Sequence, residues 1–321
     1  MTTVAPGFTA KTSSGGAGLG GLMRRIWQSR MAYLFIAPFI LHWLIFGAYP
    51  YVRGILIAFQ DYQRFKPETW GLDSFNGLNN LIEFFKDPIF WPGLKAAFYL
   101  YIAVAPFTFI LALFSAVLLN RVKNPKEAAI YRVIITLAWV IPEVAAMQVW
   151  RQIYEPNFGY LTHLVKDVLK LSSDPPTWTA DKFWYWPCFA VASIWKGYGY
   201  NMLLFLLALY NIPTDLYDAA KIDGANGWQI LRHVELPGIR NLMVLYLVTN
   251  VGWVGGGVTN VMLFGKGPNS VGETWNLYAF EAAFSQGSGR MGYSAAINFF
   301  SGVCNLIIAA TVFKLLPSQK A

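Results

Sequence analysis

The sequence predicts an all-α membrane protein with six transmembrane helices and one strongly charged loop between the fourth and the fifth. Of its 321 residues, 55% are hydrophobic and 13% are charged, whereas an ordinary soluble domain carries about 25% charged residues. The mean hydropathy is positive, at +0.40. Residues 215–240 nevertheless hold seven charged side chains. Since one charge at the centre of a bilayer costs about 2.5–3.5 kcal/mol, this segment is expected in water, between two spans.

The N-terminal 30 residues are expected to form a disordered cytoplasmic tail, because residues 1–21 are rich in Gly, Ser, Thr and Ala. Residues 31–321 then form one transmembrane domain. Its first span covers residues 32–52, which follow several arginines and exceed the length of a signal-peptide core. The positive-inside rule keeps the N-terminus in the cytoplasm. Pro38 and Pro50 can kink or end this helix, and residues 51–59 are expected to continue along the outer interface.

Five further apolar runs complete the predicted spans. A helix of about 20 residues crosses a hydrocarbon core of about 30 Å. Segments 60–93, 162–183 and 270–290 are expected outside, and 120–129 and 211–238 inside, so that both termini are cytoplasmic. The glycines at 252 and 255–257 can break the fifth helix or let another helix approach closely. The runs lie at about 94–119, 130–150, 184–210, 239–264 and 291–316.

The charged loop contains signals for two short helices. Thr214 is a suitable N-cap, and Asp215 and Asp218 fall in the first turn, where carboxylates suit the positive helix end. Gly224 can end the first helix in the left-handed conformation. Asn226 can cap a second helix that stops before Pro237. These features alone are equally typical of an ordinary helical connector.

The spacing of three short motifs in this loop is more specific. Asp218-Ala219-Ala220, Asp223-Gly224-Ala225 and Leu236-Pro237 together resemble the EAA loop of permease subunits in binding-protein-dependent ABC importers. The sequence departs from that pattern at Asp218, where glutamate is usual, and at Asn241, where a second proline often follows. Residues 195–202 and 265–270 also resemble segments of the carbohydrate permeases of the maltose type.

The resemblance, which covers about residues 32–316, implies a type I ABC importer permease fold. The motif residues would form a cytoplasmic coupling helix that docks on an ATPase subunit. The implied partners are a second, similar permease subunit in a heterodimer, two ATPase subunits, an extracytoplasmic substrate-binding protein, a sugar and membrane lipid. ATP and magnesium would be bound by the ATPase, and this chain would hold no cofactor. The implied location is the plasma membrane of a bacterium or archaeon.

No catalytic constellation is expected, so the chain should not be an enzyme. Gly265-Lys266 is followed by Gly267, and Asn260 stands where a P-loop needs its first glycine. The three histidines are scattered, and the two cysteines, Cys188 and Cys304, lie in apolar runs without metal-ligand spacing, as buried hydrophobes do. The net charge of +8 shows no basic stripe with interleaved aromatics and is attributed to lipid headgroups rather than to nucleic acid.

Two ionisable residues within the predicted spans are candidates for the substrate pathway. Glu143 lies in the third span and Lys196 in the fourth, and they either pair with each other or line an aqueous cavity. Aromatic rings can stack on the C–H faces of sugars, and amides can satisfy sugar hydroxyls, although most of the 13 tryptophans are expected to pack or to lie at the interface. The remaining candidates for the pathway are Trp150, Tyr198, Tyr200, Asn201, Asn250 and Trp253.

Three alternatives remain. An ABC permease for glycerol phosphate or another polyol-like solute would favour several cations at the cavity, and only Lys196 is well placed, so a neutral sugar is preferred. An ion-coupled secondary transporter usually has inverted repeats, and none is detectable in the sequence. A membrane enzyme would need a catalytic or cofactor cluster.

Overall fold

A computed structural model describes residues 27, 29–251, 257–285 and 287–315 of the chain. Within these ranges the regular structure is helical, and pairing between extended segments is limited to one bridge between Gln60 and Phe75. The chain divides into two compact units, Met1–Gly54 and Ile55–Ala321, which are described separately.

The first unit carries one apolar helix that continues across the boundary. It comprises α2 (Arg30–Trp43), the π-helical turn η1 (Leu44–Ala48) and α3 (Tyr49–Ala58). The expectation that a proline could end this helix at Pro38 or Pro50 is wrong. Pro38 lies inside α2, and Pro50 follows the π turn, whose wider ring tolerates a residue without an N–H group. The helix therefore runs to Ala58 rather than ending at residue 52.

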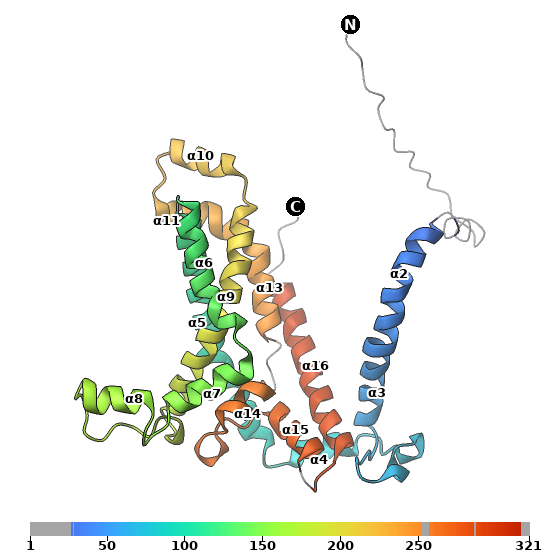
Figure 1. Ribbon diagram of the computed structural model, residues 1–321. Coiled ribbons are helices and arrows are strands. Elements are labelled where there is room, and N and C mark those ends of the chain that lie inside the picture. The colour runs from blue at the N-terminus through green and yellow to red at the C-terminus, as the bar shows by residue number, and fades with distance from the viewer. Residues whose placement is uncertain (1–26, 28, 252–256, 286, 316–321) are drawn as a thin grey trace. The chain divides into compact units, whose positions relative to one another are not determined.

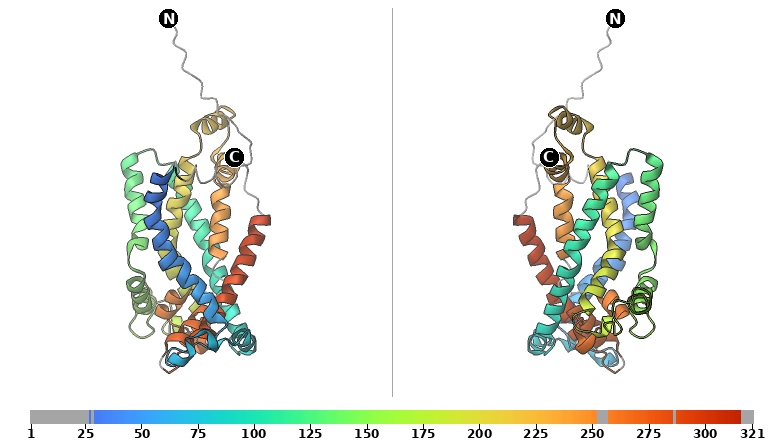
Figure 2. Two further views of the ribbon diagram at one scale, coloured as in Figure 1. Left: turned by 90° about the vertical axis from the view of Figure 1, so that its right-hand side faces the viewer. Right: turned by 90° about the vertical axis from the view of Figure 1, so that its left-hand side faces the viewer.

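The second unit is built around α5 and α9, which make the most extensive helix–helix contact in it. The helices α6, α13 and α16 run in the same general direction, and short helices close both ends (Figures 1 and 2). The elements of this unit are η2 (Pro67–Thr69), η3 (Leu72–Ser74), α4 (Asn79–Lys86), α5 (Phe90–Asn120), α6 (Pro125–Val140), α7 (Glu143–Ile153), α8 (Tyr160–His163), η4 (Leu164–Val168), η5 (Trp178–Ala180), α9 (Tyr185–Tyr210), α10 (Thr214–Ile222), α11 (Gly227–Ile230), η6 (Leu231–Glu235), α12 (Leu236–Gly238), α13 (Arg240–Val251), α14 (Val258–Phe264), η7 (Pro268–Ser270), α15 (Trp275–Phe284) and α16 (Met291–Leu315).

Length and composition alone identify three described helices that can cross a membrane: Arg30–Ala58, Phe90–Asn120 and Met291–Leu315. A fourth is added if α6 and α7 form one broken span. The predicted fourth span coincides with α9, whose 26 residues extend about 39 Å. Lys196 and four tyrosines make this helix less apolar than the three above. The predicted fifth span corresponds to α13 and α14, and residues 252–256 between them lie outside the described ranges.

Residues 130–150, the predicted third span, do not form one continuous helix. The axes of α6 and α7 meet at 89°. Pro142 causes the break, because a residue that precedes proline is driven out of the helical region. Ile141 accordingly has φ −63° and ψ 131°, which is extended. The carboxyl end of α6 and the amino end of α7 are therefore separated by only two residues, Ile141 and Pro142.

The connecting segments separate into two groups at opposite ends of this unit (Figure 1). At one end, the Arg64 N–H donates to the Gly289 carbonyl at 2.7 Å, and the Trp275 indole donates to the Phe90 carbonyl at 2.8 Å. At the other end, Arg121 donates to the Gly227 carbonyl at 3.0 Å. The segments expected outside thus gather together, away from the charged loop.

Candidate functional site

The charged loop begins with α10, whose amino end differs from the prediction. Pro213 is the N-cap residue and Thr214 is the first helical residue, so Thr214 does not cap the helix. Asp215 lies in the first turn and Lys221 in the last, as the helix dipole favours. Lys221 also forms an exposed ion pair with Asp218 at 2.8 Å, which contributes well under 1 kcal/mol.

The turn between the two loop helices follows the prediction. Gly224 has a φ of +73°, which only glycine adopts without strain. The N–H of Ala225 donates to the Ala220 carbonyl at 2.9 Å, which closes the end of α10. Asn226 then forms a capping box: its side chain accepts from the Gln229 N–H at 3.0 Å, and the Gln229 side chain accepts from the Asn226 N–H at 2.7 Å.

The second loop helix does not stop before Pro237, contrary to the prediction. It continues from α11 through the π-helical turn η6 and α12 to Gly238. Leu236, which precedes the proline, keeps helical angles of φ −61° and ψ −44°. The π turn explains this outcome, because its wider ring accommodates a proline that lacks an N–H group.

Helix α10 carries no buried residue and lies beyond the ends of α6 and α9 (Figure 1). Its Leu216 and Ile222 are 52% and 87% exposed, and Trp228 on α11 is 68% exposed. Five of the motif residues are also exposed, namely Asp218, Ala219, Asp223, Gly224 and Pro237. The other three are partly buried, namely Ala220, Ala225 and Leu236. Apolar side chains therefore stand unburied in this charged loop, as at a surface that receives a partner.

The base of this loop is attached to α5 through a buried carboxylate. Only 2% of the Glu235 side chain is exposed, and it lies 3.4 Å from the Arg121 guanidinium and 3.5 Å from the Asn120 amide. Asn120 also reaches the Tyr217 hydroxyl of α10 at 3.4 Å. Burial and the nearby Glu235 charge raise the pKa of Tyr217. Sequence reasoning missed this cluster, because 114 residues separate Arg121 from Glu235 and nothing in the local sequence pairs them.

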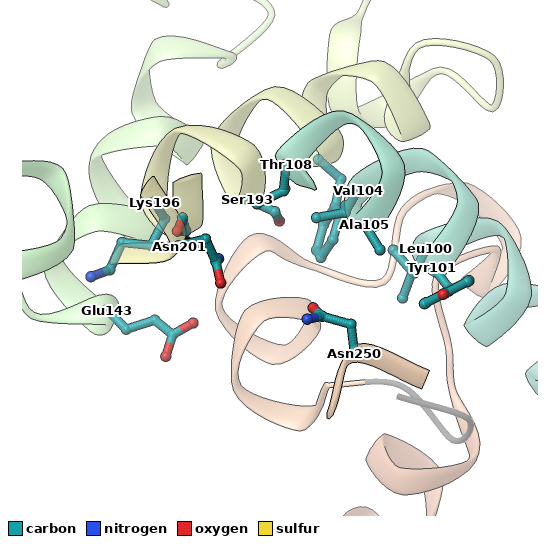
Figure 3. Close-up of a pocket in the computed structure, with 12 residues that line it drawn as sticks. Leu100, Tyr101, Val104, Ala105, Thr108, Glu143, Ser193, Lys196, Asn201 and Asn250 are labelled. Atoms are coloured by element: carbon teal, nitrogen blue, oxygen red, sulfur yellow. Dashed lines mark hydrogen bonds between the residues drawn. The ribbon is translucent and has the colours of Figure 1, made fainter. Parts of the chain in front are cut away.

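A cavity of about 200 Å³ lies among α5, α7, α9 and α13 (Figure 3). It brings together four of the eight predicted pathway residues, Glu143, Lys196, Asn201 and Asn250. Its other lining residues come mostly from one face of α5 and from the middle of α9. They are Leu100, Tyr101, Val104, Ala105, Thr108, Phe189, Ser193 and Gly197.

Of the two arrangements that the sequence left open for Glu143 and Lys196, the ion pair is not formed among the described residues, and both residues line the cavity. The Lys196 ammonium instead donates to the Trp139 carbonyl at 2.8 Å, in the last turn of α6. Glu143 lies in the first turn of α7. Each charge therefore lies where a helix end favours it, positive at the carboxyl end and negative at the amino end. The break at Pro142 creates both ends.

Polar groups of the cavity wall retain unused hydrogen-bonding capacity. The Asn201 and Asn250 amide nitrogens donate to carbonyls one turn earlier, at 3.0 and 2.9 Å, which leaves their oxygens free to accept. Thr108 and Ser193 are 5% and 9% exposed, and their hydroxyls have no partner. An unpartnered buried polar group costs about 1–3 kcal/mol. The two hydroxyls thus indicate water or a polar ligand in the cavity.

The other predicted pathway residues lie elsewhere. The Trp150 ring stacks on Tyr154 at 5.4 Å and meets Trp195 edge-on at 5.6 Å, next to the apolar core. Tyr200 stacks on Trp139 at 4.9 Å. Tyr198 is partly buried and does not line the cavity, and Trp253 lies outside the described residues.

The chemistry available at this cavity is non-covalent binding. Its lining offers one carboxylate, one ammonium, two amides, two aliphatic hydroxyls and the Tyr101 phenol, which suit a ligand with many hydroxyl groups. The described residues contain no group of three or more His, Cys, Asp or Glu side chains placed to hold a metal ion. Cys188 is buried and Cys304 partly buried, and neither is in a disulfide.

Comparisons with known proteins agree on one family. The family model described as "Binding-protein-dependent transport system inner membrane component" matches residues 90–318. Protein LplB of Bacillus subtilis is 29% identical, over 96% of this chain and 95% of that protein. The arabinooligosaccharides transport system permease protein AraP of the same organism is 28% identical, over 92% of both chains.

A solved structure shares the fold. One chain of a bacterial ABC transporter involved in the import of the acidic polysaccharide alginate superposes with a TM-score of 0.79 at 21% identity. The match covers 94% of this chain and 99% of that one. The arrangement of helices is therefore that of an ABC importer permease.

Proposed function

The chain belongs to the family of binding-protein-dependent transport system inner membrane components, and from this premise we propose that it forms half of the translocation pathway of an ATP-driven sugar importer. An extracytoplasmic binding protein delivers the sugar, and a second, similar permease subunit completes the pathway. The named permease AraP, which serves arabinooligosaccharides, supports a saccharide as cargo. The cavity among α5, α7, α9 and α13 is the part of the pathway that this chain contributes.

Two ATPase subunits supply the energy in this proposal, and they bind the ATP and magnesium. The motif residues Asp218 to Ala225, with Leu236 and Pro237, form the surface that docks on one of them. Both termini and this loop lie on the cytoplasmic side of a bacterial or archaeal plasma membrane. In this proposal the other connecting segments, which gather at the opposite end of the second unit, lie outside.

The observation that carries the proposal is the exposure of α10. A helix without a buried residue has little reason to keep its position in an isolated subunit, since most helical stability in proteins comes from packing. The 87% exposure of Ile222 gives it an apolar contact to offer. A partner that covers this helix would convert its own motion into a rigid-body displacement of the spans on either side.

Gly224→Val in the assembled importer tests the coupling. A Cβ at residue 224 meets no atom within 4 Å, so the substitution acts on the backbone alone. A β-branched residue at a φ of +73° is strained by about 1–2 kcal/mol or more, which distorts the end of α10. We expect substrate-stimulated ATP hydrolysis to be lost while the chain still inserts in the membrane.

Gly224→Asn is the matched control, because asparagine adopts the left-handed conformation more readily than valine. It should keep most of the stimulated ATPase activity. Undiminished stimulation in Gly224→Val would reject the role of the loop as the coupling element.

A further inference from the structure

Membership of the family does not decide whether the sugar is neutral or acidic, since AraP serves arabinooligosaccharides and the structural neighbour imports acidic alginate. We propose that Glu143 makes the cavity of this chain selective for neutral sugars that donate hydrogen bonds, and unfavourable for sugars that carry carboxylate or phosphate groups. The inference rests on the proposed function, because it places the cavity on the path of the sugar.

Hydrogen-bond acceptors face the cavity from Glu143, Asn201 and Asn250. Glu143 lines the cavity and makes no hydrogen bond or ion pair with another described residue. Figure 3 shows its carboxylate pointing into the space that the Asn201 and Asn250 amides also face. Each amide nitrogen already donates one of its two hydrogens within its own helix, so each asparagine offers a ligand its acceptor oxygen and one remaining N–H. The Glu143 carboxylate beside them only accepts.

The positive charge at the cavity is directed away from the space that the two asparagines face. Lys196 is the single lysine or arginine among the described residues that line the cavity. Its ammonium is directed away from the two asparagines, toward α6, where it donates to the Trp139 carbonyl (Figure 3). The charge nearest to the ligand space is therefore that of the Glu143 carboxylate.

A neutral sugar matches the polar groups that line this cavity. Its hydroxyls donate to the carboxylate and amide oxygens and also satisfy the buried Thr108 and Ser193 hydroxyls, which now lack partners. A uronate or a sugar phosphate brings an anion that only accepts. It would face Glu143 without a compensating cation, and such an unpaired like charge is an effective means of rejection.

The test measures the electrostatic potential of the cavity without requiring the identity of the sugar. Ser193→Cys is introduced into the full chain with Cys188→Ala and Cys304→Ala, and the importer is assembled in its membrane. The rate of modification of residue 193 is measured with cationic, neutral and anionic ethyl methanethiosulfonate reagents, each normalised to its rate with a free thiol. We expect the normalised rate of the cationic reagent to exceed that of the anionic one by on the order of tenfold.

Glu143→Gln should bring this ratio close to one, because glutamine keeps the shape and the acceptor oxygen but removes the charge. Lys196→Gln is the matched control and should leave the preference for the cationic reagent in place. If Ser193→Cys fails to fold, Thr108→Cys on α5 reports on the same cavity.

The outcomes separate the inference from the proposed function. Equal normalised rates for the two charged reagents, or a ratio that Glu143→Gln leaves unchanged, would overturn the selectivity while the importer function stands. The selectivity would also be overturned if Lys196→Gln changed the ratio of the cationic to the anionic rate as much as Glu143→Gln does. Failure of every reagent to reach residues 108 and 193 in any state of the importer would instead remove the cavity from the transport pathway.

Discussion

The carboxylate of Glu235 shows how one residue attaches the exposed loop to the bundle. A buried carboxylate is costly unless a cation and hydrogen-bond donors compensate it. Arg121 and Asn120, at the end of α5, supply both. Arg121 also donates to the Gly227 carbonyl at 3.0 Å. The second half of the loop therefore cannot move away from α5 without leaving a carboxylate uncompensated, so the two should move together.

Arg121→Ala tests this attachment. Removing one partner of a fully buried pair costs about 3–5 kcal/mol, but the Arg121 side chain is 45% exposed, so we expect a loss of about 1–3 kcal/mol. Thermal unfolding of the purified importer measures it. Lys221→Ala is the control: it breaks an ion pair whose two side chains are 65% and 64% exposed and should cost less than about 0.5 kcal/mol. Equal losses from the two variants would show that Glu235 needs no cation.

At the scale of elements, α6 and α9 approach each other at a glycine. A Cβ on Gly199 would overlap the Ile135 carbonyl oxygen on α6. That oxygen belongs to the helical backbone and cannot turn aside as a flexible side chain can. Small residues at such crossings let helices pack closely in a membrane, and here the close approach also brings Lys196 within reach of the Trp139 carbonyl.

Gly199→Ala should accordingly push the two helices apart and destabilise the chain by about 1–3 kcal/mol. Gly197→Ala is the control on the same helix, because the nearest atom to its new Cβ would be the Thr108 methyl group at 4.0 Å. It should be neutral or stabilise by up to about 1 kcal/mol, since alanine favours helix more than glycine does. The midpoint of thermal unfolding in detergent compares them, and an equal decrease for both would contradict the close contact.

The elements also show what the sequence can predict. The predicted spans at 94–119, 184–210 and 291–316 agree closely with α5, α9 and α16, because long apolar runs leave little choice of structure. Gly224 and Asn226 were likewise predictable from local rules. The break at Pro142 has a signal in the sequence, but the 89° angle depends on packing.

The roles of the cavity residues were harder to foresee. Two opposite charges in neighbouring spans suggested a pair, yet Lys196 binds a backbone carbonyl that becomes available only because α6 ends at the break. Thr108 and Ser193 gave no signal, because hydroxyls in helices usually donate to the carbonyl one turn earlier. Only the cavity geometry reveals that these two do not.

At the scale of the whole second unit, Asp87 joins the start of α5 to the C-terminal part of the chain. Its carboxylate accepts from the Tyr293 hydroxyl at 2.6 Å and from the Tyr278 hydroxyl at 2.9 Å. Tyr278 lies on α15 and Tyr293 on α16, about 200 residues later in the chain. The Ile89 N–H donates to the other carboxylate oxygen at 3.0 Å. One side chain thus connects three helices at the end opposite to α10.

This arrangement predicts a dependence of stability on pH. Burial raises the pKa of Asp87, but the hydrogen bonds from the Ile89 N–H and the Tyr293 and Tyr278 hydroxyls, with the nearby Arg290 charge, outweigh it and lower that pKa below its usual range. The ionised form is therefore favoured in the folded state. Its stabilisation is complete above the pKa of the unfolded chain, about 3.9, and is lost as the pH falls through the lower, folded value.

Asp87→Asn should remove this part of the pH dependence, because asparagine keeps the size of the side chain but has no proton to gain. The midpoint of thermal unfolding, measured from pH 7 to pH 3, should decrease more steeply in the parent protein than in the variant. The variant should be the less stable of the two at pH 7, since a neutral amide accepts more weakly from the two tyrosines than a carboxylate does. Parallel curves over this range would mean that Asp87 gains its proton with the same pKa in the folded and unfolded states, and that the link between α5 and the C-terminal helices does not depend on its charge.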